Sequence, residues 1–203
     1  MIYEKLSNVT GAPVLIKPSI IKDERGYFME AFKLNEFKEN IGDINFVQEN
    51  ESCSCAGTFR GLHFQNPPFA QAKLVKVVQG SAVDIIVDIR KGSPKYGYMY
   101  KAYLSGKNKY QFFVPEGYAH GFLALEDSTI FQYKCSNYYN KENERGILFE
   151  SLESVEDTIE EFYPWQRLIT SYKDNQWIKF DEFNSPFSFK EENHISKIKI
   201  AKI

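Results

Sequence analysis

The chain has 203 residues, of which 43% are hydrophobic, and it carries a formal net charge of −2 at pH 7. A chain of this length buries roughly 70% of the surface that its unfolded form exposes, so we expect one domain over residues 1–203, with its strands in 1–150 and short helices and a tail in 151–203. Neither lysine nor arginine is in excess, and no stretch approaches the ~20 apolar residues that cross a bilayer, so neither nucleic acid nor a membrane is expected as a partner.

Short segments in which apolar and polar residues alternate, separated by turn residues, follow one another along most of the chain. The pattern predicts ten β-strands, at residues 14–21, 26–32, 45–50, 58–64, 73–78, 82–89, 98–104, 110–115, 121–126 and 129–135. Weaker helical patterns cover residues 34–42 and the acidic segment 151–162. Strands at this spacing indicate an all-β sandwich or barrel. The tail 197–203, KIKIAKI, is expected to be either an edge strand or disordered.

Three polar side chains of different chemistry are predicted to point into one interior, because alternate residues of a strand share a face. Lys73 shares its face with Val75 and Val77, Tyr133 with Phe131 and Cys135, and His63 with Phe59, Gly61 and Gln65. The runs 73–80 and 82–89 are apolar on both faces. We therefore expect a second sheet or a second subunit to cover their outer face.

A base, an ammonium and a phenol that meet in a barrel are the groups needed to move a proton beside a carbonyl. A structural interpretation is also open, because a buried histidine commonly satisfies a hydrogen bond and a buried lysine commonly finds a carboxylate. Asp84 and Asp88 are the candidates for such a partner of Lys73.

The stretch DERGYFMEAF, residues 23–32, places Phe28, Glu30 and Phe32 on one face. A carboxylate between two rings suits a site that stacks a nucleobase and accepts its imide hydrogen. Arg25 precedes this group across a glycine turn. In the structural alternative, Arg25 pairs with Asp23 or Glu24 on the surface and the rings belong to the core.

The three cysteines, Cys53, Cys55 and Cys135, are an odd number, so we expect reduced thiols. The first residues, MIYEKLSNV, lack the basic and apolar regions of a signal peptide, so a cytoplasmic location is expected. Only three histidines are present, and Cys53 and Cys55 lack the spacing of a tetrahedral zinc site. We expect neither a metal nor a cofactor.

Seven motifs carry a family resemblance: DERGYFMEAF, FVQEN, FRGLHFQ, AQAKLVKVVQG, DIIVDIRKGSPKYG, LSGKNKYQFFVPEGYAHGF and FQYKCSNYYNKENERGI. Over residues 14–149 or so, their order and spacing resemble those of the dTDP-4-dehydrorhamnose 3,5-epimerases. The resemblance implies a double-stranded β-helix, the cupin-type jelly roll, without metal or cofactor and working as a homodimer. It implies inversion of carbons 3 and 5 of dTDP-4-keto-6-deoxyglucose in making the rhamnose donor.

The resemblance also assigns catalytic roles residue by residue. His63 matches the family's proton acceptor, Tyr133 the proton donor on the opposite sugar face, and Lys73 the lysine beside the keto oxygen. The stretch LITSYKD resembles the pattern that supplies the carboxylate partner of the histidine, which implies Asp174, with Asp84 as the second choice. The residues implied to contact the nucleotide sugar are Arg25, Phe28, Glu30, Gln48, Glu49, Asn50, Arg60, His120, Tyr139, Glu144 and Lys173, with Phe28 and Tyr139 around the thymine.

Three alternative functions stay open at this point. A 3-monoepimerase acting on a related nucleotide sugar would keep His63, Lys73 and Tyr133. A metal-dependent cupin would need a His-x-His pair, whereas RGLHFQ offers one histidine. A sugar-nucleotide-binding protein without activity would bind dTDP but exchange no hydrogen with solvent.

Overall fold

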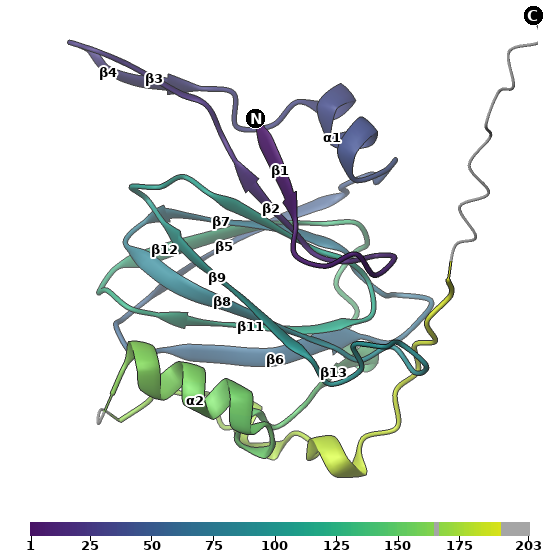
Figure 1. Cartoon of the computed structure of the whole chain (residues 1–203). Coiled ribbons are helices and arrows are strands. Elements are labelled where there is room, and N and C mark those ends of the chain that lie inside the picture. The colour runs from purple at the N-terminus through teal and green to yellow at the C-terminus, as the bar shows by residue number, and fades with distance from the viewer. Residues whose placement is uncertain (165–166, 192–203) are drawn as a thin grey trace, which may run out of the picture.

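Segments of alternating apolar and polar residues form antiparallel strands, and all but one hairpin of them pack as two sheets face to face (Figure 1). The computed structural model of the protein describes residues 1–164 and 167–191; the predicted strand or disorder of the tail 197–203 lies outside the described residues. The predicted all-β jelly roll with short helices is confirmed.

The first sheet has six strands and the second has five. In spatial order, the first contains β1 (Ile2–Lys5), β2 (Val14–Lys17), β10 (Gln111–Val114), β7 (Lys73–Gln79), β12 (Thr129–Cys135) and β5 (Gln48–Ser54). The second contains β13 (Glu144–Gly146), β6 (Phe59–Gln65), β11 (Tyr118–Ala124), β8 (Ser81–Asp88) and β9 (Met99–Ser105). A separate hairpin consists of β3 (Ile20–Asp23) and β4 (Gly26–Met29).

Two α-helices flank the sheets, α1 (Leu34–Asn40) and α2 (Glu153–Phe162), at both predicted places. Short 3₁₀ helices occupy Lys141–Asn143, Phe149–Ser151, Asp174–Gln176 and Phe180–Glu182, and the third of these is η3. Among the described residues, no helix has the length and apolar character needed to cross a membrane.

The interior between the sheets is filled by the faces that strand alternation predicts. Val75 and Val77 of β7 and Phe131 of β12 belong to this core, and the rings of Phe122 and Phe131 stack at 4.0 Å. Lys73 and Tyr133 project from the same faces at the end of the sandwich. The predicted shared faces of these two residues are therefore confirmed.

A second hydrophobic core lies on the outer face of the second sheet, as predicted from the strand that is apolar on both faces. The chain's own C-terminal part covers this face, with α2 lying against it (Figure 1) and Phe183 and Phe187 packing further along. The cover is thus neither a second sheet nor a second subunit. On the first sheet, α1 covers the part of the outer face formed by β2, β10 and β7, through Phe37.

Each of the ten predicted strand segments contains a strand or part of one, and the pattern missed two short strands, β1 and β13. The segment 14–21 forms two strands, β2 and β3, separated by Pro18 and Ser19. Proline lacks the N–H that a continuing ladder needs, which explains the break.

Strand β6 departs from strict alternation beside its histidine. His63 pairs with His120 of β11, whereas Arg60 pairs with Phe122, so two residues of β6 lie opposite the single residue Gly121. Such a bulge turns the following side chains to the other face.

This bulge changes which neighbours His63 has. At the bulge, the backbones of β6 and β11 are in close contact. A Cβ atom at residue 61 would lie only 2.6 Å from the Cα of Gly121, so this position requires glycine. Phe59 belongs to the core outside the second sheet, whereas His63 and Gln65 line the same interior cavity. The predicted grouping of His63 with Gln65 is confirmed, and its grouping with Phe59 is wrong.

The hairpin β3–β4 projects away from the sandwich at the edge where β1 and β2 lie (Figure 1). Its large side chains are open to solvent, with Ile21 and Phe28 each 66% exposed. An isolated two-stranded hairpin is marginally stable in water, so these apolar side chains lack the cover that such an element normally has.

Candidate active site

One cavity of about 250 Å³ lies where the ends of both sheets face each other. Its walls are formed by Gln48, Asn50, His63, Phe64, Gln65, Gln71, Lys73, Tyr133, Tyr139 and Glu144. All of them except Phe64, Gln65 and Gln71 belong to the predicted site. His63 comes from the second sheet, whereas Lys73 and Tyr133 come from the first, so the cavity is contacted from opposite sides.

His63 forms a close pair with Asp174. The Nε2 atom of the imidazole lies 2.5 Å from Oδ1 of the carboxylate, which is almost fully buried. The structure therefore places Asp174, and not the second choice Asp84, beside His63. An ionised carboxylate accepts the hydrogen on Nε2, which leaves Nδ1 as the nitrogen that can take a proton.

The carboxylate of Asp174 is held from several sides. It begins η3, and its backbone N–H donates to Oγ of Ser171 at 3.1 Å. Burial by itself raises a carboxyl pKa, but hydrogen bonds from His63, Ser171 and Trp177 and the charge of His63 outweigh burial and lower the pKa of Asp174. The carboxylate is therefore ionised at neutral pH.

Lys73 and Tyr133 come from neighbouring strands of the first sheet. The Nζ atom of Lys73 lies 5.7 Å from the centre of the Tyr133 ring. Burial lowers the pKa of Lys73, against the opposing charges of Cys135, Asp84 and Glu144. Burial also raises the pKa of Tyr133, which keeps the phenol protonated.

Glu144 joins two other predicted contacts at the rim. The hydroxyl of Tyr139 donates to its Oε2 at 2.6 Å, and Nζ of Lys173 lies 2.6 Å from its Oε1. The hydrogen bond to Glu144 raises the pKa of Tyr139 to about 12. Burial opposes ionisation of Glu144, but the bonds from Lys173 and Tyr139 outweigh it and lower the pKa of this carboxyl.

His120 is not among the residues that line the cavity. Its Nε2 lies 2.8 Å from Oδ2 of Asp84, and both side chains are buried. Burial lowers the pKa of His120 and raises that of Asp84. The other oxygen of Asp84, Oδ1, has no hydrogen-bond partner within residues 1–164 and 167–191. Asp88 pairs instead with Arg90, at 2.5 Å.

Four predicted substrate contacts lie away from this cavity, and Arg60 does not line it but is close enough for its charge to act on the Tyr133 phenol. Glu49 points to the outer face of the first sheet, where it pairs with Lys134 at 2.9 Å, and Nε of Arg60 donates to Oγ of Ser54 at 3.2 Å. Arg25, Phe28 and Glu30 lie on or beside the projecting hairpin, and Arg25 pairs with Asp23 at the surface. One chain by itself does not bring Glu49 or the three hairpin residues to His63.

Two glutamines of the cavity wall were not predicted. Gln65 accepts a hydrogen bond from the backbone N–H of Asn140 at 2.6 Å and donates to the carbonyl of Tyr138 at 3.1 Å. Gln71 donates to the carbonyl of Asn137 at 2.7 Å. These bonds hold the loop that carries Tyr139. The only signal in the sequence that could have found these glutamines is their position, because Gln65 lies two residues from His63 and Gln71 two residues from Lys73.

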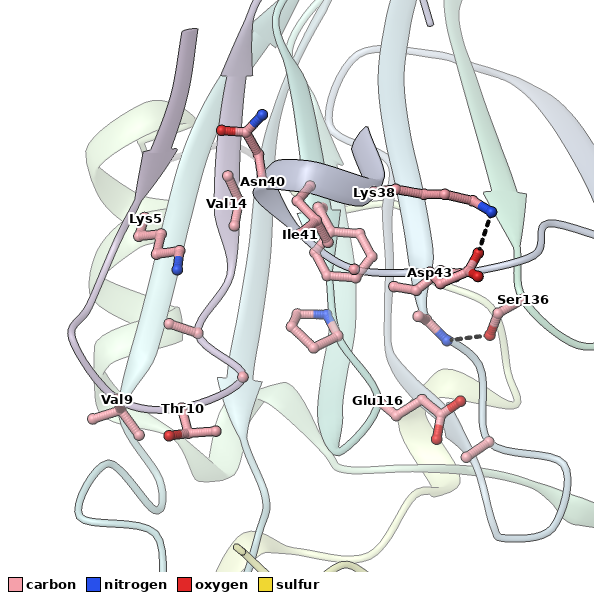
Figure 2. A pocket seen from close by; sticks show the side chains of 18 of the residues that line it. Lys5, Val9, Thr10, Val14, Lys38, Asn40, Ile41, Asp43, Glu116 and Ser136 are labelled. Carbon is pink, nitrogen blue, oxygen red and sulfur yellow. Dashed lines mark hydrogen bonds and ion pairs between the residues drawn. The ribbon is translucent and has the colours of Figure 1, made fainter. Parts of the chain in front are cut away.

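A larger hollow of about 930 Å³ lies on the outer side of the first sheet (Figure 2). It is bounded by the loop 7–12, the end of α1 and Glu116, and Lys38 pairs with Asp43 at its rim. No predicted site residue lines this hollow. The chemistry is therefore concentrated in the smaller cavity between the sheets.

The donor set of the smaller cavity suits proton transfer better than metal binding. No group of three His, Cys, Asp or Glu side chains that could hold a metal ion occurs in the described part of the chain. A carboxylate-supported imidazole on one side and an ammonium with a protonated phenol on the other provide a base, a counter-charge and an acid.

Comparison with known proteins identifies a family with this fold. The family profile described as dTDP-4-dehydrorhamnose 3,5-epimerase matches residues 8–182. The dTDP-4-dehydrorhamnose 3,5-epimerases of Shigella flexneri and Methanothermobacter thermautotrophicus are each 44% identical, over 82% and 81% of this chain and 90% and 87% of their own. The crystal structure of an epimerase from Legionella pneumophila, in complex with dTDP-4-keto-L-rhamnose, superimposes with a TM-score of 0.82 at 34% identity, covering 94% of this chain and 99% of that one. The chain belongs to the dTDP-4-dehydrorhamnose 3,5-epimerase family.

Proposed function

We propose that the protein is an isomerase that inverts carbons 3 and 5 of a dTDP-4-keto-6-deoxyhexose by proton abstraction and reprotonation, without a metal. The observation that carries the proposal is that His63 from one sheet and Lys73 and Tyr133 from the other line the same cavity. Family membership and the dTDP sugar in the Legionella relative support the substrate class.

The hydrogens at carbons 3 and 5 are acidic because both carbons flank the C4 ketone. In the proposed reaction His63 removes one of these protons as the C–H bond breaks, and the electron pair passes to O4 as an enolate. Asp174 supports the imidazolium that forms, and Lys73 stabilises the charge on O4 from a partly dry wall.

Inversion requires the new proton to arrive on the opposite face of the sugar. Tyr133 donates it as the enolate collapses, because burial keeps the phenol protonated and so able to donate. His63 then loses its proton to solvent and Tyr133 regains one, which returns the enzyme to its first state. Each inversion therefore introduces one solvent hydrogen.

The test is incubation with dTDP-4-keto-6-deoxyglucose in deuterium oxide, read by proton NMR at both carbons. We expect wash-in at carbons 3 and 5 with the wild-type protein. His63→Ala removes the base, which typically contributes ~10²–10⁴-fold, so wash-in at both carbons should be abolished. Binding of dTDP by this variant serves as the control for folding.

Unchanged wash-in in His63→Ala would refute the assignment of the base. The same spectrum distinguishes the alternatives, because a 3-monoepimerase labels carbon 3 alone and a binding protein labels neither. The metal-dependent cupin is not favoured, because the cavity has one histidine in its lining.

We further propose that the protein works as a homodimer in which each hairpin β3–β4 reaches the cavity of the other copy. The cavity of about 250 Å³ is below the ~300 Å³ at which ligand pockets begin, so a nucleotide sugar needs further walls. The hairpin carries the predicted nucleotide contacts Arg25 and Phe28, exposed and away from the cavity of its own chain.

We also propose that residues 1–203 form one domain and that the protein acts in the cytoplasm. The strands of the second sheet and the C-terminal segment share one core, which supports the single domain. The three cysteines are free, which supports a reducing compartment.

A further inference from the structure

We propose that Trp177 is a positioning residue that holds the carboxylate of Asp174 in the orientation in which it supports His63. The inference rests on the proposed function and names a residue that neither the sequence motifs nor the cavity lining includes.

The first observation is a shared oxygen. The indole Nε1 of Trp177 donates to Oδ1 of Asp174 at 3.4 Å, and the same oxygen lies 2.5 Å from Nε2 of His63. An indole N–H only donates, so it cannot compete with the carboxylate for the hydrogen of His63. Two donors on one oxygen fix the rotation of the carboxylate more tightly than one does.

The second observation is a gap in the neighbouring strand that accommodates the indole. Gly146 of β13 pairs with His63, and a Cβ at Gly146 would lie 2.5 Å from Nε1 of Trp177. The indole therefore packs against the backbone opposite His63. The two rings meet edge to face, with their centres 6.1 Å apart and their planes at 72°.

The third observation is that the backbone on either side of Trp177 is anchored. Ile178 forms a parallel bridge with Ile147, and its carbonyl accepts the N–H of Leu148 at 2.9 Å. On the other side, η3 carries Asp174 itself. The indole is thus attached to a fixed segment, as a positioning group must be.

The indole also keeps a competing cation in place. Nζ of Lys173 lies 5.6 Å from the centre of the Trp177 ring and pairs with Glu144 at 2.6 Å. Lys173 directly precedes Asp174 in the chain. Without the ring, its ammonium has less to hold it at Glu144 and can draw the carboxylate away from His63.

A purely structural role would lower stability without acting through Asp174, and a double-mutant cycle separates the two roles. Trp177→Phe keeps the ring and removes the N–H. We expect kcat for deuterium wash-in to fall about tenfold with KM unchanged. A tenfold fall corresponds to the low end of the range for the loss of one hydrogen bond to a charged group. In an Asp174→Asn background, Trp177→Phe should cause no further loss.

Tyr172→Phe is the matched control, because it removes one polar hydrogen from an aromatic ring in the same segment, where Tyr172 is 83% exposed. We expect this variant to behave as the wild type. Additive losses in the cycle, or wild-type kcat in Trp177→Phe, would overturn the inference.

A readout independent of activity separates this inference from the proposed function. A histidine N–H bonded to a carboxylate gives a downfield proton signal that is lost when the pair opens to solvent. For His63 we expect the signal in the wild type and in Tyr172→Phe, and its broadening in Trp177→Phe. A signal that is equally sharp in Trp177→Phe would refute the positioning role even if no variant turned over substrate.

Discussion

Lys73 and Tyr133 share a cavity wall, yet burial shifts their pKa values in opposite directions. Burial disfavours the charged form of each group. For Lys73 the charged form is the protonated ammonium, so its pKa falls; for Tyr133 it is the deprotonated phenolate, so its pKa rises. The two ordinary values, about 10.4 and about 10, lie close together, so these opposed shifts favour loss of the ammonium proton before the phenol proton as pH rises.

This order predicts which group sets the alkaline limit of activity. Because the enolate needs the charged ammonium, kcat/KM should fall as pH rises through a value below the ordinary ~10.4 of lysine. Lys73→Arg keeps a cation that does not titrate in this range, so the fall should disappear, at a lower overall rate. Tyr133→Phe should lose rate but keep the fall. Wash-in rates between pH 7 and 10.5 test all three.

The matched control is Lys76→Met, on the same strand but the opposite face, which should leave the profile unchanged. Lys73→Met should lower kcat by about 10²–10³, as removal of a donor to an oxyanion does. An alkaline fall that persists in Lys73→Arg would assign it to another group.

Single side chains were predictable where a motif or a strand face specifies them. Lys73 and Tyr133 follow from strand alternation, and Asp174 follows from the stretch LITSYKD, 111 positions from its partner. Gln71 and Trp177 escaped prediction, because a glutamine that braces a loop and an indole that reaches a carboxylate leave no periodic signal. Their roles depend on which segments the fold brings together.

At the scale of elements, the hairpin β3–β4 explains why the predicted site is divided. Strand patterns predict that Phe28 and Glu30 share a face. They do not reveal whether that face approaches the cavity of its own chain or that of a second copy. Likewise, strict alternation of side chains does not predict the bulge at Gly61, so the neighbours of His63 were predicted only in part. The elements themselves were predictable because their alternation is local.

If each hairpin completes the cavity of the other copy, two defective variants should restore each other. One variant is His63→Ala, and the other is Arg25→Ala with Phe28→Ala. In a mixed dimer, one cavity has an intact His63 and receives an intact hairpin. After equimolar refolding, half of the dimers are mixed and one of their two cavities is competent, so we expect about a quarter of wild-type wash-in at subsaturating substrate.

The control mixes His63→Ala with Lys73→Met. Each substitution damages the cavity of the chain that carries it, because His63 and Lys73 line the same cavity. Each mixed dimer then has two defective cavities, so no activity should return. Equal activity in both mixtures would contradict the exchange of hairpins, as would no gain in the first.

At the scale of the molecule, one C-terminal segment both completes a core and carries the carboxylate that pairs with His63. Residues of α2 and of the segment 180–187 fill the core outside the second sheet, against Val83, Ile85 and Val87 of β8. The same segment carries Asp174 to His63. The double apolar pattern of β8 predicted a cover on this face, but only the fold shows that the segment forming the cover also carries the carboxylate that lies beside His63.

A shared core predicts one cooperative unfolding transition, because the sheets cannot keep their apolar outer face covered once the C-terminal segment leaves. Trp165→Phe leaves Trp177 as the single tryptophan, so its fluorescence reports on that segment while far-UV circular dichroism reports on the strands. Titrated with urea, the two signals should give the same midpoint and slope. A chain ending at residue 150 should show no cooperative transition, because it bares the face around Ile85. If the fluorescence changed at lower urea while the strand signal stayed intact, the segment would be a separate unit, and His63 would lose Asp174 before the fold was lost.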